Sequence, residues 1–245
     1  NPAEYNRKRL DEVLDVLIDG PNTTDAAAIT YRDNFDNARG FLLDPAVKVA
    51  DGDAEVVVSL SPFVAGLIAK IDADRGFWWS PSNQTLSGVI GTARPIDFLL
   101  GDENSRANLL NEQDINTVIR QNGFRFWGSR TLAATDKKFA FLPVRRTADM
   151  INDSIQQASL TFVDRPINKA LFEAVTDTVN AYLRDLTSQG AILGGECWYE
   201  RETNSNSQLM QGIVRFKYKF QPPTPAEHII YESAVVEDYF DVVFS

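Results

Sequence analysis

The sequence is poor in the side chains that carry most metal and thiol chemistry. Its 245 residues include one cysteine, Cys197, and one histidine, His228. A single cysteine excludes a disulfide within the chain, and one cysteine with one histidine excludes a zinc site of the Cys/His type. His228 is the only base available to a nucleophilic triad, and it stands in an extended segment near the C-terminus. Cys197 lies in an apolar, strand-like stretch, which disfavours the thiolate and indicates packing.

Phosphate-binding loops and membrane spans are missing as well. Neither G-x-G-x-x-G nor a Gly-Lys-Ser/Thr loop occurs, so nucleotide binding has no support in the sequence. No stretch approaches the ~18 continuous apolar residues of a membrane span. The net charge of −10 argues against general nucleic-acid binding. We therefore expect no cofactor, no metal, no nucleic acid and no membrane partner, although the 44% hydrophobic content is enough for an ordinary globular core.

Helical and strand patterns alternate along the first third of the chain. The pattern after residue 5 fits a helix, but the run before Gly20-Pro21 fits a short buried strand equally well. Pro62 fits the first turn of a helix, where its missing N–H costs no hydrogen bond. The expected elements are a helix at 5–17 or a strand at 16–19, a helix at 25–34 capped by Thr23 or Thr24, strands at 40–43 and 47–49, and a helix starting at Ser61. This order favours a mixed α/β (α+β) fold, with a β-sheet flanked by helices.

The middle of the chain predicts a long structured connection followed by two long helices. Residues 76–101 are punctuated by Gly, Pro and Ser, but their aromatic side chains favour burial. Apolar residues recur at helical spacing in both long helices, and Gly190 marks the end of the second. The expected elements after the connection are a short helix at 104–113, strands at 115–121, 124–128 and 138–142, and helices at 144–162 and 167–186.

The last part of the chain has the pattern of a strand followed by an extended arm. Residues 213–220 alternate, with Arg215, Lys217 and Lys219 on one side and Phe216, Tyr218 and Phe220 on the other. Such alternation is typical of a half-buried strand. A stiff Pro-rich segment follows, and residues 227–245 then hold five acidic and no basic side chains, with β-prone runs at 229–231 and 241–244. We interpret this end as a C-terminal arm.

Charge is distributed unevenly along the chain. Residues 120–146 hold seven basic side chains and one acidic one, so the remainder carries about −16. A positive face on an acidic protein with an acidic arm fits head-to-tail self-association. A solvated basic strand edge that prevents aggregation fits equally well, and charge alone leaves both open. The basic residues of this segment are Arg120, Arg125, Arg130, Lys137, Lys138, Arg145 and Arg146.

A hydrolytic α/β enzyme domain is an alternative of a different class. With 34 acidic residues, carboxylate pairs such as Asp72/Asp74 and Asp102/Glu103 are available for acid/base work. The connection at 76–101 is where such a site would lie, and clustering of polar chemistry around Ser80, Asn83 or Asp97 would favour it. Nothing in the sequence singles these residues out.

Several blocks of the sequence resemble the contractile tail sheath proteins of myophages and of R-type pyocins. The resemblance covers essentially the whole chain. The blocks are Gly76–Asn83, Gly91–Pro95, Asn108–Asn111, Gly123–Thr131, Val144–Asp153 and Gly190–Gly195. Ser129 departs from the pattern, which has Asn at that position, so a local turn contact is expected to differ.

The resemblance implies a structural role and no enzymatic activity. A member of this family is expected to polymerise helically around a tail tube and to contract, driving the tube through a target cell envelope. The implied partners are other sheath subunits, the tail tube protein, the baseplate and the tail terminator. The implied place is a virion tail or a pyocin-like particle, assembled in the host cytoplasm. Another tail component, such as a tube or baseplate part, is the alternative within this class.

The resemblance also implies an organisation and a set of interface residues. Family members are longer at the N-terminus, so we expect this chain to be the C-terminal two-thirds of such a protein. Residues 1–75 are then the rest of an α/β domain, 76–225 a C-terminal sheath domain, and 226–245 an arm donated to a neighbouring subunit.

Three groups of residues are expected to make these contacts. The arm residues are Ile229, Ile230, Tyr231, Val235, Val236, Asp241, Val242, Val243 and Phe244. The acceptor or adjoining strand is Arg215, Phe216, Lys217, Tyr218, Lys219 and Phe220. The expected contacts with the tube or a neighbour are the seven basic residues of 120–146 together with Lys169 and Arg184.

Overall fold

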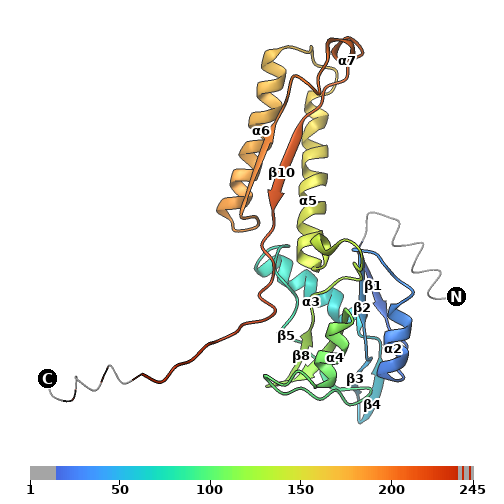
Figure 1. Ribbon diagram of the computed structural model, residues 1–245. Helices are drawn as coiled ribbons and strands as arrows, with labels where there is room; N and C mark the ends of the chain where they lie inside the picture. Colours follow the sequence, from blue (N-terminus) through green and yellow to red (C-terminus); the bar gives the residue numbers. More distant parts are fainter. Residues whose placement is uncertain (1–14, 237–238, 240–242, 244–245) are drawn as a thin grey trace.

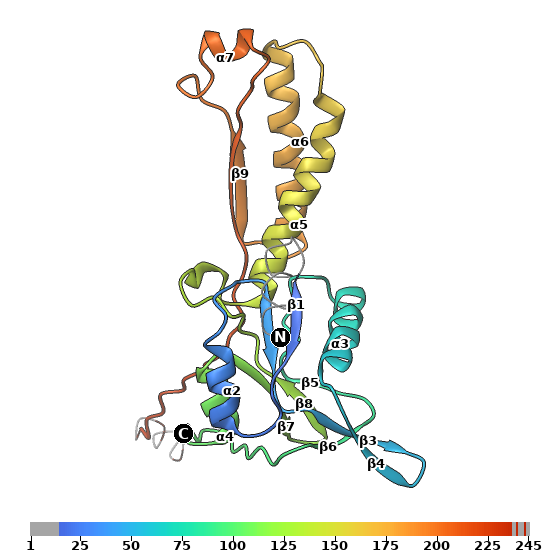
Figure 2. The same ribbon diagram turned by 90° about the vertical axis from the view of Figure 1, so that its right-hand side faces the viewer.

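The computed structural model, which describes residues 15–236, 239 and 243, consists of two lobes and an extended arm (Figure 1). The lower lobe comprises residues 15–141 and contains the larger sheets. The upper lobe comprises residues 142–221 and is an elongated layer of helices with one β-hairpin (Figure 2). The chain leaves the upper lobe at the junction of the two and runs away from the body as the arm.

A five-stranded mixed sheet forms the centre of the lower lobe. Its order is β1-β2-β7-β8-β5, with β1, β2 and β7 parallel and the remaining pairs antiparallel. The strands are β1 (Val16–Asp19), β2 (Gly40–Leu43), β7 (Ile115–Arg120), β8 (Phe124–Trp127) and β5 (Gln84–Thr85). The expected mixed sheet flanked by helices is therefore confirmed.

A smaller antiparallel sheet of order β4-β3-β6 extends the lower lobe. It consists of β3 (Val47–Asp51), β4 (Ala54–Val58) and β6 (Val89–Thr92). Its β3–β4 hairpin projects from the end of the lobe (Figure 2). Most of β4 is exposed. Its sequence therefore lacks the alternation of buried and exposed residues that marks a strand, and β4 was not predicted.

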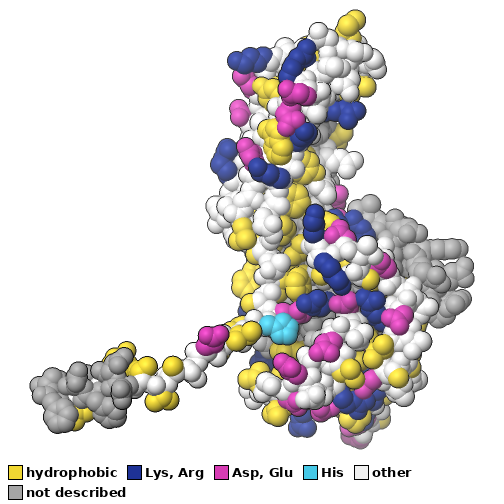
Figure 3. All heavy atoms as spheres, viewed as in Figure 1, with side chains coloured by type: hydrophobic (Ala, Val, Ile, Leu, Met, Phe, Trp, Pro, Cys, Tyr) yellow, Lys and Arg dark blue, Asp and Glu magenta, His cyan; other side chains and the backbone are white. Residues whose placement is uncertain are grey.

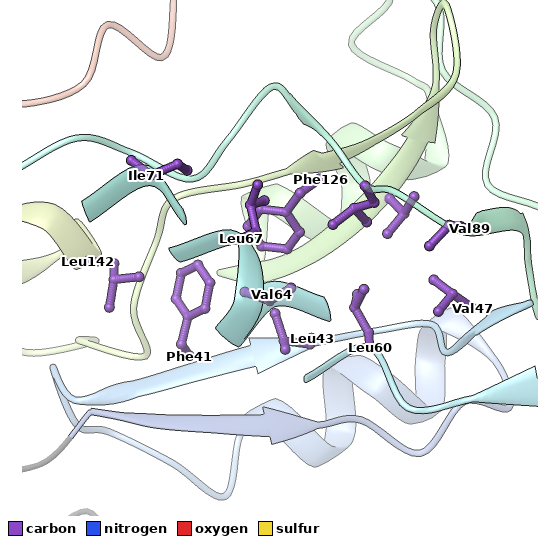
Figure 4. Close-up of a cluster of buried hydrophobic side chains, with 12 residues drawn as sticks. Phe41, Leu43, Val47, Leu60, Val64, Leu67, Ile71, Val89, Phe126 and Leu142 are labelled. Atoms are coloured by element: carbon purple, nitrogen blue, oxygen red, sulfur yellow. The ribbon is translucent and has the colours of Figure 1, made fainter. Parts of the chain in front are cut away.

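Helices cover both faces of the central sheet. On one face, α3 (Ser61–Asp74) packs its Val64 and Leu67 with Phe41 and Leu43 of β2 (Figure 4). On the other face, α2 (Asp25–Arg32) and α4 (Arg106–Glu112) pack around Leu42. Because alternate side chains of a strand point to opposite faces, one continuous apolar strand serves both cores. All four residues of β2 are buried.

The upper lobe is built on two long helices. These are α5 (Leu142–Ser159) and α6 (Lys169–Ser188), with the short 3₁₀ helix η2 (Leu160–Phe162) after α5. The Asn168 side chain accepts a hydrogen bond from the Leu171 amide and so caps α6. Gly190, at φ +79°, ends it. The antiparallel hairpin of β9 (Gly194–Trp198) and β10 (Lys217–Gln221) covers the helices, and α7 (Asn206–Met210) connects its strands.

Several expected elements differ in the structure. Residues 16–19 form a strand, so the helical alternative is wrong at 16–17, while residues 5–14 lie outside the described part. Residues 138–142 are not a strand: the 3₁₀ helix η1 (Lys137–Phe139) leads directly into α5. The connection at 76–101 contains β5 and β6, which sequence reasoning missed. The expected strand at 213–220 begins only at Lys217.

Candidate functional site

The described part of the arm consists of exposed apolar side chains. Ile230, Tyr231 and Val235 are 85%, 88% and 104% exposed. Figure 3 shows the hydrophobic side chains of the arm standing clear of the body. Ile229, Val236 and Val243 are exposed as well, whereas Asp241, Val242 and Phe244 lie outside the described residues. A run of large apolar side chains in water has a hydrophobic reason to bind another surface.

The hairpin of the upper lobe has one aromatic face and one charged face, as the alternation predicts. Phe216 and Phe220 pack against the core between α5 and α6. On the outer face, Lys217 pairs with Glu200, and Lys219 pairs with Glu196 at 2.9 Å. Tyr218 donates its hydroxyl hydrogen to Asn152 of α5 at 2.7 Å. The hairpin is thereby fixed to the helices on one face while the other remains in water.

One edge of the hairpin is already occupied. The Asn180 side chain of α6 accepts the Cys197 backbone N–H at 2.7 Å and donates to the Cys197 carbonyl at 2.9 Å. An amide that bonds both backbone groups of one residue acts like a short neighbouring strand on β9. Sequence analysis did not identify Asn180, because one asparagine on a helix gives no local signal of what it faces.

The predicted basic residues do not form one surface. Arg145 and Arg39 both bind Asp149, and Arg146 binds Asp72 of α3. The pairs with Arg39 and Asp72 hold the start of α5 to the lower lobe, whereas the Arg145–Asp149 pair lies within α5. Two more of the predicted residues make internal contacts: Arg130 binds Glu227 at the base of the arm at 2.6 Å, and Arg125 donates to the Asn83 carbonyl at 2.8 Å.

The remaining predicted basic residues are at the surface, in three separate places. Arg120 lies at the end of β7, Lys137 and Lys138 on η1, and Lys169 and Arg184 on α6. Lys169 pairs with Glu173 one turn further along the helix. The two positions on α6 belong to the upper lobe and lie 15 residues apart, which is about 22 Å along the helix axis.

A carboxylate in the lobe junction is held in an unfavourable environment. Burial, together with the nearby charge of Asp149, raises the pKa of Asp15 to about 6. The nearest cation is Arg146, whose Nε lies 3.9 Å from Asp15 Oδ2. Asp15 Oδ1 is buried without a hydrogen-bond partner. The junction therefore combines tight ion pairs with one carboxylate whose charge is poorly compensated.

The residues proposed for an enzymatic site do not converge. Ser80 Oγ donates to or accepts from Ser129 Oγ at 2.9 Å, Asn83 accepts from Arg125, and Asp97 accepts the Arg106 amide. A cavity of about 220 Å³ lies beside the carboxyl ends of β1 and β2, but the Asp19 carboxylate that lines it accepts the Ser61 amide at the start of α3. Ser129, the position that departs from the family pattern, contacts Ser80 through its side chain and accepts the Leu142 amide with its carbonyl at 2.9 Å.

The described residues lack a membrane-spanning helix and a clustered metal site. Within residues 15–236, 239 and 243, no helix is long and apolar enough to span a membrane. The same residues contain no group of three or more His, Cys, Asp or Glu side chains placed to hold a metal ion.

Comparison with known families accounts for almost the whole chain. The family model described as the phage tail sheath protein central domain matches residues 8–132. The model described as the phage tail sheath C-terminal domain matches residues 134–235. The boundary between these matches falls in the segment that links β8 to α5, close to the junction of the two lobes.

Curated relatives and solved structures agree with these matches. The chain is 43% identical to a prophage major tail sheath protein of Pseudomonas aeruginosa over 93% of its length and 59% of the relative's. It is 39% identical to the tail sheath protein of Burkholderia phage BcepMu, covering 87% of the chain and 46% of that protein. The chain thus spans about half the length of these relatives.

Among solved structures, the helical sheath of the anti-feeding prophage in its contracted state matches with a TM-score of 0.75. The identity is 26%, over 89% of this chain and 60% of that one. The contracted sheath complex of an extracellular contractile injection system, PVC, matches at 0.74 and 25% identity, over 92% of this chain and 64% of that one. On these matches and the fold, the chain belongs to the phage tail sheath family.

Proposed function

We propose that the chain is a structural subunit of a contractile tail sheath, which polymerises helically around a tail tube and contracts to drive that tube through a cell envelope. The observation that carries this proposal is the arm, whose apolar side chains have no partner within the described chain. The solved relatives are sheaths in contracted helical assemblies, which supports the same role. The role is mechanical and needs no catalytic residue.

The partners follow from this role. Other copies of the subunit, the tail tube, the baseplate and the tail terminator are the proposed contacts, in a phage tail or a pyocin-like particle assembled in the host cytoplasm. A related chain occurs in a structure of the anti-feeding prophage baseplate, which supports a baseplate contact. A tube or baseplate part is the alternative, and it predicts rings or monomers in place of helical tubes.

We propose that the arm adds a strand to the hairpin of a neighbouring subunit, and that β10 provides the acceptor edge. The Asn180 side chain bonds the backbone of Cys197 on β9, and the residue paired with Cys197 on β10 is Tyr218. Because Cys197 directs its backbone groups toward Asn180, Tyr218 directs its own away from β9 in an antiparallel pair. The outer edge of β10 therefore presents the donors and acceptors that strand addition uses.

Charge contributes little to this pairing. The outer face of β10 carries Lys217 and Lys219, but each already pairs with a glutamate of the same subunit, Glu200 or Glu196. Exposed ion pairs of this kind add little to affinity, so backbone hydrogen bonds and apolar contacts are the proposed source of binding.

For the tail tube we propose Lys169 and Arg184 on α6 as contacts, with Arg120, Lys137 and Lys138 available to a neighbouring subunit. Arg130, Arg145 and Arg146 are used within the subunit and are less suited to an external partner.

Negative-stain electron microscopy tests the proposal. The chain in its natural full-length context, with or without preassembled tail tubes, is compared with a variant lacking residues 227–245. We expect striated hollow tubes that are lost on deletion, while circular dichroism remains that of a folded protein. Rings or monomers from the intact protein, even with tubes as nuclei, would contradict a sheath role.

A further inference from the structure

We propose that Arg130 and Glu227 form a latch that holds the base of the arm on the lower lobe, so that the freely moving part of the arm begins at His228. Arg130 is then a positioning residue: it sets the point and direction from which the arm departs, and opening the latch lengthens the arm's reach. The consequence for assembly rests on the proposed sheath function, whereas the latch itself is a property of the single subunit.

The geometry of the pair is that of a strong ionic contact. Arg130 Nε donates to both carboxylate oxygens of Glu227, at 3.0 and 2.9 Å, and Nη2 donates to Oε2 at 2.6 Å. A guanidinium that meets a carboxylate through two nitrogens fixes orientation as well as distance. The two residues are 97 positions apart in the sequence, so the contact closes a long loop.

Arg130 is itself held in place. Its guanidinium carbon lies 5.1 Å from the centre of the Phe141 ring, a cation–π contact. Arg130 and Phe141 also form an antiparallel backbone bridge. Because Phe141 immediately precedes α5, the latch lies where the lower lobe, the start of the upper lobe and the arm meet.

Exposure changes at the latch. Pro222 is buried and Pro223 and Pro225 are partly buried, whereas Thr224 and Ala226 are already exposed; the Glu227 side chain is 25% exposed. Beyond it, Ile229 and Ile230 are 66% and 85% exposed. The constraint on the chain therefore ends at Glu227.

Opening the latch has a defined geometric effect. It releases residues 223–227, which at ~3.3 Å per extended residue adds about 17 Å to the reach of the arm. The pair is partly in water, with exposed side-chain fractions of 33% and 25%, so only a modest stabilisation holds it closed. A modest latch suits a lattice whose subunits change their separation while the arms stay attached.

Spin labelling in the isolated subunit tests the latch. A nitroxide at Ile229→Cys reports on the arm, and the native Cys197, 3% exposed, stays unlabelled. In the parent we expect a predominantly slow component in the electron paramagnetic resonance spectrum. In Arg130→Gln and in Glu227→Gln, the ratio of slow to fast components should fall about fivefold, the effect of losing one such contact.

Matched variants distinguish loss of the Arg130–Glu227 contact from a nonspecific effect of the substitution on the fold. The charge swap Arg130→Glu with Glu227→Arg should restore part of the slow component, which a merely structural loss would not. Arg165→Gln removes an arginine stacked on Phe162 at 5.1 Å in the upper lobe, the same distance as the Arg130–Phe141 contact, and should leave the spectrum unchanged. A fast spectrum in the parent, or equal spectra in the parent and Arg130→Gln, would overturn the latch.

Electron microscopy of the same variants tests the consequence separately. If the latch pre-orients the arm, the protein concentration needed for tubes should rise severalfold in Arg130→Gln and fall again in the charge swap. Unchanged assembly despite a mobile arm would overturn the positioning role and leave the sheath function standing. A parent with a slow spectrum that never forms tubes would contradict the sheath function and leave the latch standing.

Discussion

At the scale of single residues, the lower lobe depends on a buried carboxylate, Asp44, whose pKa burial raises in spite of its hydrogen bond from Asn22 and its ion pair with Arg94. Asp44 is fully buried and pairs with Arg94, and its Oδ2 accepts the Asn22 amide at 2.8 Å. Gly20 passes directly over it: a Cβ on Gly20 would lie 2.6 Å from Asp44 Oδ2. Arg94 also pairs with Asp25 of α2, so one arginine ties the helix to the end of β2.

Removal of this arginine should be costly. We expect Arg94→Met to lower the free energy of unfolding by about 3–5 kcal/mol, because it leaves the Asp44 carboxylate buried without its cation. Urea denaturation measures the loss. Lys70→Met, which breaks an exposed pair with Asp74 on α3, is the control and should change stability by less than about 0.5 kcal/mol. Similar losses in both variants would contradict this account of Asp44.

The raised pKa of Asp15 predicts that its contribution to stability falls as the pH rises, whereas most carboxylates contribute more at higher pH. Its pKa of about 6 lies above the ordinary value of 3.8, so the folded state binds this proton more tightly than the unfolded state. The protonated Asp15 side chain therefore contributes its full stabilisation below pH 3.8, and this stabilisation is lost as the pH rises through about 6. At pH 7 the ionised carboxylate thus destabilises the fold, by about 1–3 kcal/mol.

The variant Asp15→Asn isolates this effect. We expect it to be more stable than the parent at pH 7 by about 1–3 kcal/mol, with the difference shrinking toward pH 4. Urea denaturation across this range gives the difference directly. A constant difference at all pH values would show that the substitution acts through packing and not through the charge.

At the scale of elements, the upper lobe illustrates how a helix can close a sheet edge. The hairpin has only two strands, too few for a stable sheet in isolation, and it depends on α6 through Asn180 and through close packing. A Cβ on Gly195 of β9 would lie 3.2 Å from Leu183 of α6. The absence of that carbon lets the strand approach the helix.

The Asn180 contact can be tested by substitution. Asn180→Leu should destabilise the fold by about 2–3 kcal/mol, because the Cys197 N–H and carbonyl lose both hydrogen bonds in a half-buried site. Asn152→Leu removes the acceptor of the Tyr218 hydroxyl on the exposed face of α5 and serves as the control, with a loss below about 1 kcal/mol. Thermal and urea unfolding compare the two. Equal losses would mean that Asn180 does not close the β9 edge.

At the scale of the whole molecule, a substitution in the arm should affect the proposed assembly without affecting the stability of the subunit. Val235 is fully exposed, so Val235→Asp should change the stability of the subunit by less than about 0.5 kcal/mol. If another copy buries this side chain as proposed, tube formation should nevertheless be lost, because a charge then replaces an apolar anchor. Electron microscopy and thermal unfolding provide the two readings.

A control for this prediction lies on the upper lobe. Val163, which follows η2 and is 60% exposed, belongs to no proposed interface, so Val163→Asp should assemble as the parent does. If Val235→Asp formed tubes at the parent's concentration, the arm would not be an apolar anchor.

Sequence reasoning was most successful where the signal is local. The helices that start at Asp25 and Ser61 were predicted from a capping residue and a proline, and both form where expected. The expected strand at 138–142 was wrong because its apolar residues serve a different purpose: Leu142 is buried in the core of the lower lobe as the first residue of α5. Short apolar runs carry no periodicity that separates these cases.

The exposed arm was predicted from the sequence, while its contacts with other copies stay a prediction. The arm and the alternating strand before it follow from composition and a period of two, which are properties of neighbouring residues. For the basic segment the sequence left two interpretations open, a positive face and a solvated strand edge, and three of its arginines pair with different carboxylates. Sequence counts charges but does not show which carboxylate folds against each arginine.

The sequence by itself therefore determined the absence of metal and nucleotide motifs, the order of most helices and strands, and the acidic apolar arm. Tertiary structure alone decided that Arg130 holds Glu227, that Arg39 and Arg146 fasten the lobe junction, and that Asn180 closes one edge of the hairpin. The physical reason is the separation along the sequence of the residues that interact. Capping, alternation and composition act over a few residues, whereas an ion pair between positions 97 apart exists only once the fold has brought them together.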